Sequence, residues 1–133
     1  MTTESDNIKK MLQKAQMVMM NAYAPYSHFL VGACILADDN NYYVGCNVEN
    51  IAYRLTTCAE CAAICNMISY GGKHITEMVI TTSKDMIISP CGACRQQIIE
   101  FAAPDRKIHL FSAHGKKETI FVKDLLPLAF NSF

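Results

Sequence analysis

Two short cysteine segments constrain the fold of this chain more than any other feature. One is Thr57-Cys58-Ala59-Glu60-Cys61, and the other is Pro90-Cys91-Gly92-Ala93-Cys94-Arg95. Each lies where we expect a helix to begin, and the positive end of a helix stabilises a thiolate. Cys58, Cys91 and Cys94 all fall in such first turns. Cys91 and Cys94 are three residues apart, so both can face one ion. The fold is therefore expected to bring two distant helix starts together.

Three clustered thiolates predict a zinc site with an open position. Thiolates bind Zn²⁺, and a zinc ion with three protein ligands keeps its fourth position for a water molecule, whose pKa it lowers. Glu60 lies two residues after Cys58 and is placed to move protons beside that water. We therefore interpret Cys58, Cys91 and Cys94 as ligands of one Zn²⁺ per chain and Glu60 as a catalytic acid and base.

Less reactive interpretations fit the same residues. Thr57 to Glu60 has the pattern of a capping box, in which Glu60 would bond to the start of its own helix. Cys61 could complete a closed structural site with four thiolates. The gap between Cys61 and Cys91 argues against that site, because it exceeds the ~15–20 residues typical of paired zinc knuckles. The four histidines have no ligand-like spacing, and we interpret them as structural or surface residues.

The composition excludes several classes of protein. The chain has 133 residues, of which 51% are hydrophobic, and no net charge; this predicts one globular domain over residues 1–133 and no nucleic-acid partner. No stretch is long and apolar enough to span a membrane, and the acidic start does not resemble a signal peptide. Seven cysteines, an odd number, argue against a disulfide framework, so we expect a cytoplasmic protein.

The hydrophobic pattern predicts helices alternating with strands. We expect helices over about 5–23, 58–70 and 90–103, the last with Ser89 as N-cap, and a short helix over 124–128. Strands are expected over 29–37, 42–46, 78–82, 108–111 and 119–122. The third and fourth strands should be parallel, and the fourth and fifth antiparallel. The predicted fold class is α/β, a three-layer α-β-α sandwich with a mixed five-stranded sheet.

The cysteine segments resemble the signature of the small, homotetrameric, zinc-dependent cytidine deaminases. Further matching segments follow in order along nearly the whole chain: 22–27, 29–33, 45–50, Tyr53, 90–96 and 125–130. The resemblance implies hydrolytic deamination of cytidine and deoxycytidine to uridine and deoxyuridine, in pyrimidine salvage. Zinc hydroxide would attack C4, and Glu60 would carry protons to N3 and to the departing ammonia.

The resemblance also implies which residues hold the zinc and the nucleoside. Cys58, Cys91 and Cys94 would bind zinc. The substrate would be held by further side chains from several parts of the chain: Asn47 and Glu49 at the ribose hydroxyls, Phe29 against the base, Ala59 in the substrate site, and Tyr53 and Phe130 from a neighbouring subunit. The monomer would then be incomplete, and a homotetramer would be the active form.

One position departs from the family pattern. Cys61 stands where the family usually has an arginine, which donates hydrogen bonds to the zinc thiolates and offsets their charge. Arg95, next to Cys94, is the expected replacement. Relatives that act on blasticidin S also lack this arginine. Two alternatives therefore stay open: a deaminase of another aminated pyrimidine nucleoside such as blasticidin S, and a non-catalytic zinc domain.

Overall fold

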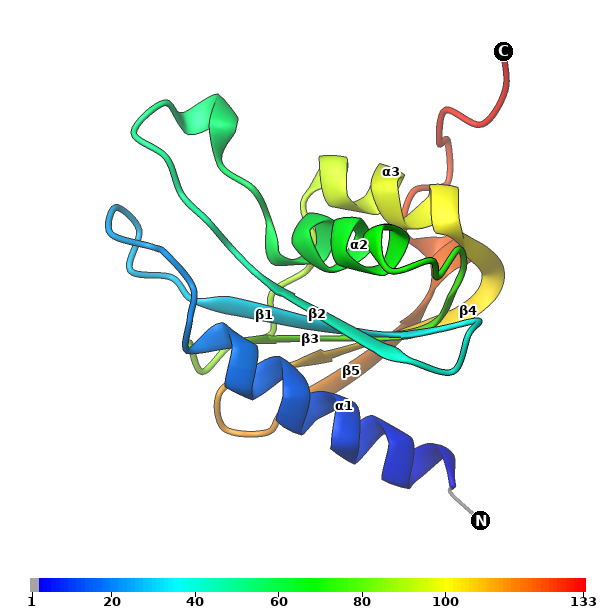
Figure 1. Ribbon diagram of the computed structural model, residues 1–133, viewed down its shortest axis with the longest axis horizontal. Helices are drawn as coiled ribbons and strands as arrows, with labels where there is room; N and C mark the ends of the chain where they lie inside the picture. The colour runs from blue at the N-terminus through cyan, green and yellow to red at the C-terminus, as the bar shows by residue number, and fades with distance from the viewer. Residues whose placement is uncertain (1–2) are drawn as a thin grey trace.

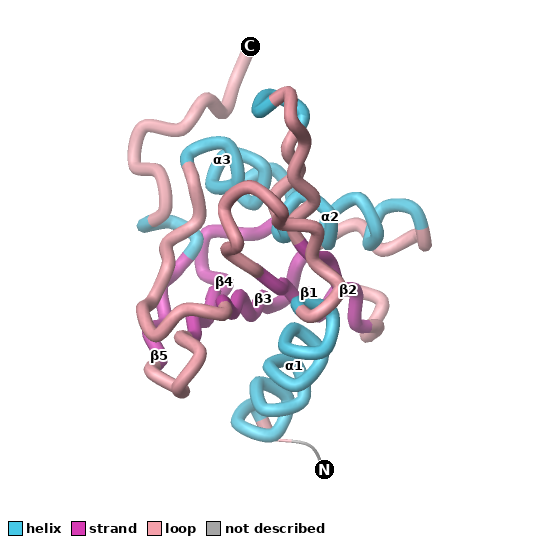
Figure 2. The backbone as a smooth tube through the Cα atoms, turned by 90° about the vertical axis from the view of Figure 1, so that its left-hand side faces the viewer, coloured by secondary structure: helices cyan, strands magenta, loops and turns pink. Residues whose placement is uncertain are grey.

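The structure, a computed structural model that describes residues 3–133, is built on one five-stranded sheet between two helical layers (Figure 1). The helices are α1 (Glu4–Met19), α2 (Ala59–Ser69) and α3 (Gly92–Phe101). The strands are β1 (Val31–Ala37), β2 (Tyr42–Cys46), β3 (Ile75–Thr82), β4 (Ala102–Phe111) and β5 (Lys117–Phe121). Helix α1 covers one face of the sheet, and α2 and α3 cover the other, as Figure 2 shows from the side. The predicted three-layer α-β-α sandwich is confirmed.

The sheet has the strand order β2-β1-β3-β4-β5 and is mixed, as predicted. Strands β3 and β4 are parallel, with α3 between them in the chain, whereas β4 and β5 are antiparallel. Strand β1 pairs antiparallel with both β2 and β3. Within residues 3–133, no helix combines the length and apolarity needed to cross a bilayer.

The central strand β3 separates two hydrophobic clusters, because successive residues of a strand face opposite sides of the sheet. Val79 packs with Met11 and Ala15 of α1. Met78 and Ile80 pack on the other side, in the cluster that contains the buried residues of α2. The sheet therefore presents one set of side chains to α1 and a different set to the layer that carries the cysteines.

Helix α2 lies directly on β2, and Gly45 allows this close approach. A Cβ atom at Gly45 would lie 2.3 Å from the backbone nitrogen of Ala63 and 2.7 Å from the carbonyl oxygen of Ala59, far inside normal contact distance. Ala59, Ala63 and Met67 are buried, as expected for a helix that is apolar almost all round. This contact holds the first turn of α2, and with it Cys58, next to the end of β2.

The predicted end of the first helix is wrong because tertiary contacts capture the chain first. The hydrophobic spacing predicts a helix that continues to Tyr23, but α1 ends at Met19. Tyr23 instead donates its backbone N–H to the carbonyl of Asn47 at 3.0 Å, and Tyr23 and Val48 form an isolated parallel bridge. The start of the helix is stabilised by Thr3 and Asp6, which form a capping box.

The other element boundaries differ where pairing overrides local sequence. Ser89 is not a helix N-cap; Cys91 holds that position, with extended backbone before α3. Strand β3 begins at Ile75, three residues earlier than expected, because Ile75 pairs with both Ala37 and Ala102. Strand β4 begins at Ala102, directly after α3. The sequence pattern does not predict the two short 3₁₀ helices, Tyr53–Leu55 and Val122–Asp124, and the second stands in place of the expected helix over 124–128.

Candidate metal centre and active site

Three cysteine sulfurs meet where helices α2 and α3 begin. Cys58 is the N-cap of α2, Cys91 is the N-cap of α3, and Cys94 lies in the first turn of α3. The Sγ atoms of Cys58 and Cys91 are 3.9 Å apart, and those of Cys91 and Cys94 are 3.4 Å apart. In a tetrahedral zinc site with Zn–S bonds of about 2.3 Å, sulfurs lie about 3.8 Å from one another. The three thiols therefore have the spacing of ligands to one Zn²⁺.

The surroundings of this cysteine group favour thiolates. Neither helix start has a side-chain cap, so free backbone N–H groups and the positive end of each helix face the sulfurs. Hydrogen bonding from Cys94, with a smaller contribution from Cys91, lowers the pKa of Cys58 to about 7 despite its partial burial. The same interaction raises the pKa of Cys94, which keeps the shared proton. A divalent cation would replace that proton and allow all three sulfurs to ionise.

Glu60 is buried beside the cysteines and does not cap its helix. Its side chain is 5% exposed, and the N-cap of α2 makes no side-chain hydrogen bond, so the capping-box interpretation is wrong. Burial raises the pKa of Glu60 above its ordinary value. A buried carboxyl with a raised pKa can exchange a proton more readily near neutral pH than an exposed one.

A cavity of about 210 Å³ joins Glu60 to the cysteines. Its lining combines polar and thiol side chains with apolar ones: Asn47, Thr56, Cys58, Glu60, Ser89 and Cys91, with Val31, Ala59, Ile80, Ile88 and Pro90. Strands β1 and β3, the start of α2 and the segment before α3 all contribute to this lining. The cavity brings together Cys58, Ala59, Glu60, Asn47 and Cys91 among the predicted site residues.

Asn47 and Glu49 follow β2 and are both held in place by backbone groups. The side-chain amide of Asn47 donates to the carbonyl of Phe29 at 2.8 Å and accepts from the N–H of Val31 at 2.9 Å. The carboxylate of Glu49 accepts from the N–H groups of Tyr26 and Ser27 at 3.0 and 3.1 Å and from the Ser27 hydroxyl. These bonds, above all the one from Ser27, lower the pKa of Glu49 and keep it ionised.

A second cavity, of about 400 Å³, holds Glu49 and Tyr53 with Tyr26, Ser27, Asn50 and Thr56. Thr56 lines both cavities, so the two adjoin. Phe29 is half-buried next to Asn47 but lines neither cavity in the described part of the chain. Phe130 is 66% exposed, and Gln96 of α3 fixes its backbone through two hydrogen bonds, of 2.8 and 3.2 Å. Within one chain, Phe130 thus lies apart from the cysteine cavity.

A comparison with known proteins identifies the family. Residues 5–110 match the family model described as "Cytidine and deoxycytidylate deaminase zinc-binding region". This chain belongs to that deaminase family. Zinc binding is a property of the family, and Cys58, Cys91 and Cys94 form a group in this deaminase that can hold one ion.

Individual relatives are similar to this deaminase over most of their length. A cytidine deaminase of Sporosarcina psychrophila is 38% identical over 125 residues, which cover 94% of this deaminase and 92% of that protein. A cytidine deaminase of Mycobacterium tuberculosis is 39% identical, with 82% and 78% covered. The crystal structure of a cytidine deaminase from Burkholderia pseudomallei superposes with a TM-score of 0.87 at 35% identity, covering 92% of this deaminase and 98% of that chain.

Arg95 does not contact the clustered thiols, so the expectation that it replaces the arginine of the family pattern is wrong. Its guanidinium donates to the carbonyls of Pro90 at 2.8 Å and Leu125 at 2.6 Å and to the Ser89 hydroxyl, rather than to a thiol. Arg95 therefore ties the segment before α3 to the C-terminal region and orients Cys91 indirectly. Among residues 3–133, Cys61 is not part of the group of clustered sulfurs. A closed four-thiolate site therefore has no support from the geometry.

Sequence reasoning missed Thr56, Ser89 and the apolar walls of the cysteine cavity. Val31 and Ile80 look like ordinary strand residues in the sequence, and only the pairing of β1 with β3 places both at the same end of the sheet. Ile88 and Ser89 lie in an irregular segment with no periodicity to interpret. Proximity to the cysteine segments, at positions 88–90 and 56, is the one signal that could have pointed to them.

Proposed function

We propose that this chain is a single-domain, zinc-dependent cytidine deaminase that hydrolyses cytidine and deoxycytidine to uridine and deoxyuridine. The observation that carries the proposal is the buried carboxyl of Glu60 in one cavity with Cys58 and Cys91, two of the three clustered thiols. A structural zinc site has no need of a buried acid or of an adjoining cavity. Membership of the deaminase family and the named cytidine deaminases among its relatives support the same reaction.

Different residues of the chain bind the zinc ion and transfer protons in this reaction. Zinc bound by Cys58, Cys91 and Cys94 would supply a water molecule of lowered pKa. Glu60 takes a proton from that water and delivers it to N3 of the pyrimidine, which makes C4 a better electrophile. The water oxygen bonds to C4, and Glu60 carries the second proton of that oxygen to the amino group as the C4–N bond breaks. Water is consumed and ammonia is released, with no change in oxidation state.

The nucleoside is bound by the polar groups that follow β2. Asn47 and Glu49 hold the ribose hydroxyls: Asn47 lines the cysteine cavity and Glu49 lines the adjoining one, so a sugar would lie between the base and solvent. Ala59 presents the first turn of α2 to the base. Phe29 packs against the base. A site of this kind, with small apolar walls and few fixed polar groups, suits a planar base.

The test is a direct assay of the purified protein. Conversion of cytidine to uridine lowers the ultraviolet absorbance of the base, so cytidine, deoxycytidine and blasticidin S are compared side by side. We expect turnover of cytidine and deoxycytidine. Turnover of blasticidin S alone would favour the alternative nucleoside, and no turnover of any of the three would refute the enzyme proposal.

The active form is a homotetramer in the cytoplasm, and neighbouring subunits complete each site. The two aromatic side chains that the resemblance assigns to a neighbour's site are exposed in one chain: Tyr53 is 80% exposed, and Phe130 is 66% exposed. Aromatic residues are enriched at protein interfaces, where their large side chains become buried between subunits. Seven free thiols suit a reducing compartment.

Complementation between two inactive variants tests the shared site. Glu60→Gln removes the acid but leaves Phe130 intact, and Phe130→Ala does the reverse. When the two are unfolded together and refolded as a mixture, some sites should receive an intact Glu60 from one subunit and an intact Phe130 from another. We expect activity well above that of either variant refolded alone, with light scattering reporting a tetramer. An unchanged activity would place Phe130 outside the neighbour's site.

A further inference from the structure

A second group of potential metal ligands lies on the opposite face of the sheet from the cysteines. Glu4 of α1, Glu77 of β3 and His109 of β4 place their ligand atoms within 4.8 Å of one another. The register explains the meeting, since Glu77 pairs with Lys107 and Val79 with His109 across the parallel strands. Alternate residues of a strand share a face, so Glu77 and His109 both face the α1 side.

His109 is buried and oriented by hydrogen bonds at both ring nitrogens. Its side chain is 2% exposed, in contrast to a surface histidine. Nδ1 lies 2.8 Å from the hydroxyl of Thr119, its cross-strand partner on β5, and Nε2 lies 2.5 Å from a carboxylate oxygen of Glu77. Histidine ligands commonly use one nitrogen for the metal while a second polar group holds the other. Thr119 supplies that second group here.

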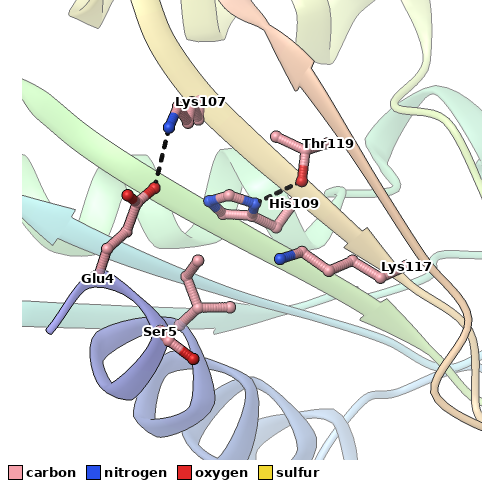
Figure 3. Close-up of a pocket in the computed structure, with 7 residues that line it drawn as sticks. Glu4, Ser5, Lys107, His109, Lys117 and Thr119 are labelled. Carbon is pink, nitrogen blue, oxygen red and sulfur yellow. Dashed lines mark hydrogen bonds and ion pairs between the residues drawn. The ribbon is translucent and has the colours of Figure 1, made fainter.

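Glu4 completes the group, and its present partner is an exposed lysine. The carboxylate of Glu4 lies 3.0 Å from the ammonium group of Lys107, which lowers the pKa of Glu4 (Figure 3). Both side chains are substantially exposed, and exposed ion pairs contribute little to stability. Lys107 can therefore move into solvent at little cost. Lys117 also approaches the group from the solvent side (Figure 3).

An open cavity of about 320 Å³ gives access from solvent to Glu4 and His109, two of the three members of this group. It is lined by Glu4, Ser5, Ile8, Lys107, His109, Lys117 and Thr119 (Figure 3). The cavity leaves room for water molecules to complete a coordination sphere. With His109 neutral, the two carboxylates carry two negative charges, which match a divalent cation.

We propose that Glu4, Glu77 and His109 form a second metal site, which takes a divalent transition-metal ion such as Zn²⁺. The ion replaces the proton between His109 and Glu77 and draws Glu4 away from Lys107. One imidazole and two carboxylates suit zinc better than Mg²⁺, which prefers oxygen ligands alone. Because the ligands come from α1, β3 and β4, the ion fastens the first turn of α1 to the sheet.

The competing interpretation is a purely structural network of hydrogen bonds and one ion pair. It explains the same contacts, but it predicts a different response at Glu4 and Lys107. Removing either partner breaks the same ion pair and should have the same effect on a structural network. For a metal site, removing Glu4 and removing Lys107 affect the affinity for the ion differently. Loss of Glu4 weakens binding because Glu4 is a ligand, whereas loss of Lys107 does not, because Lys107 is a competing cation.

The experiment counts zinc by mass spectrometry after equilibrium dialysis of untagged, folded protein against buffered Zn²⁺. We expect wild type to bind one ion more per chain than His109→Gln. Glu4→Gln should weaken the additional site by about 10–100-fold or more, and Lys107→Gln should leave it unchanged or tighter. X-ray absorption should show that the additional zinc has nitrogen and oxygen neighbours and no sulfur.

Three outcomes would overturn the proposal. Wild type could bind only the zinc of the cysteine group. An additional zinc could survive unchanged in His109→Gln, which would make it an adventitious surface ion. Glu4→Gln and Lys107→Gln could also weaken zinc binding equally. Glu4 and Lys107 are both exposed, so these two variants are expected to fold even if His109→Gln does not.

Discussion

Replacing Glu60 with glutamine should lower kcat for cytidine by about 10²–10⁴-fold, the usual contribution of a positioned general acid and base. Glutamine has nearly the same shape and keeps the side chain buried, but it can neither accept the proton from water nor deliver it to N3. The loss should fall on kcat rather than on KM, because binding of the nucleoside depends on other residues. Steady-state kinetics with cytidine measures both constants.

Zinc content is the control that separates chemistry from assembly in this variant. Glu60 lies between Cys58 and Cys61, so a change there could disturb the metal group instead of the proton transfer. We expect Glu60→Gln to retain one zinc ion per chain in the cysteine group and an unchanged melting temperature. A variant that retains zinc and wild-type turnover would show that Glu60 does not carry the protons.

Replacing Cys91 with alanine should remove both the zinc of the cysteine group and the activity. The Sγ atom of Cys91 lies 3.9 Å from that of Cys58 and 3.4 Å from that of Cys94. Loss of a supporting group beyond the ligands already weakens a metal site by about 10–100-fold, and loss of a ligand itself should exceed that. Because Cys91 is exposed, the fold should survive the change. Metal analysis after gel filtration, with the cytidine assay, measures the effect.

Two other cysteines of the same helix layer provide matched controls. Cys65→Ala removes an exposed thiol outside the group, and Cys61→Ala removes the thiol that follows Glu60. Both variants should keep the zinc ion of the cysteine group. Loss of that zinc from Cys61→Ala would make Cys61 a ligand, and its retention by Cys91→Ala would refute the three-thiolate assignment.

The elements of the fold are predictable where local periodicity and pairing agree. The hairpin of β1 and β2 and the parallel pairing of β3 with β4 follow from apolar runs, turn residues and the length of the connections. The end of α1 is not predictable in this way, because Tyr23 leaves the helix to bond with Asn47, a residue distant in sequence. The first half of β4 is largely exposed and carries Pro104, so its sequence lacks a strand pattern.

The metal ligands and the proton carrier of the candidate site are predictable because these residues lie close together in the sequence. Two cysteines three residues apart, and an acid next to a third, indicate a metal and a proton carrier through residue type and spacing alone. The hydrogen-bond partners of the Arg95 guanidinium do not follow from the sequence, since they include the carbonyl of Leu125, which is 30 residues away. His109 has no ligand-like spacing for the same reason, because its neighbours Glu4 and Glu77 lie on other elements.

The position of β3 at the centre of the sheet makes the chain far more tolerant of substitution than of insertion or deletion there. From Glu77 onward, Met78 and Ile80 face the layer of the cysteine cavity, with Ile80 in the cavity wall, and Glu77 and Val79 face α1. Losing or gaining one residue would exchange these sets along the rest of the strand. A single such event would damage both faces of the sheet at once, so length variation during divergence should be confined to the loops.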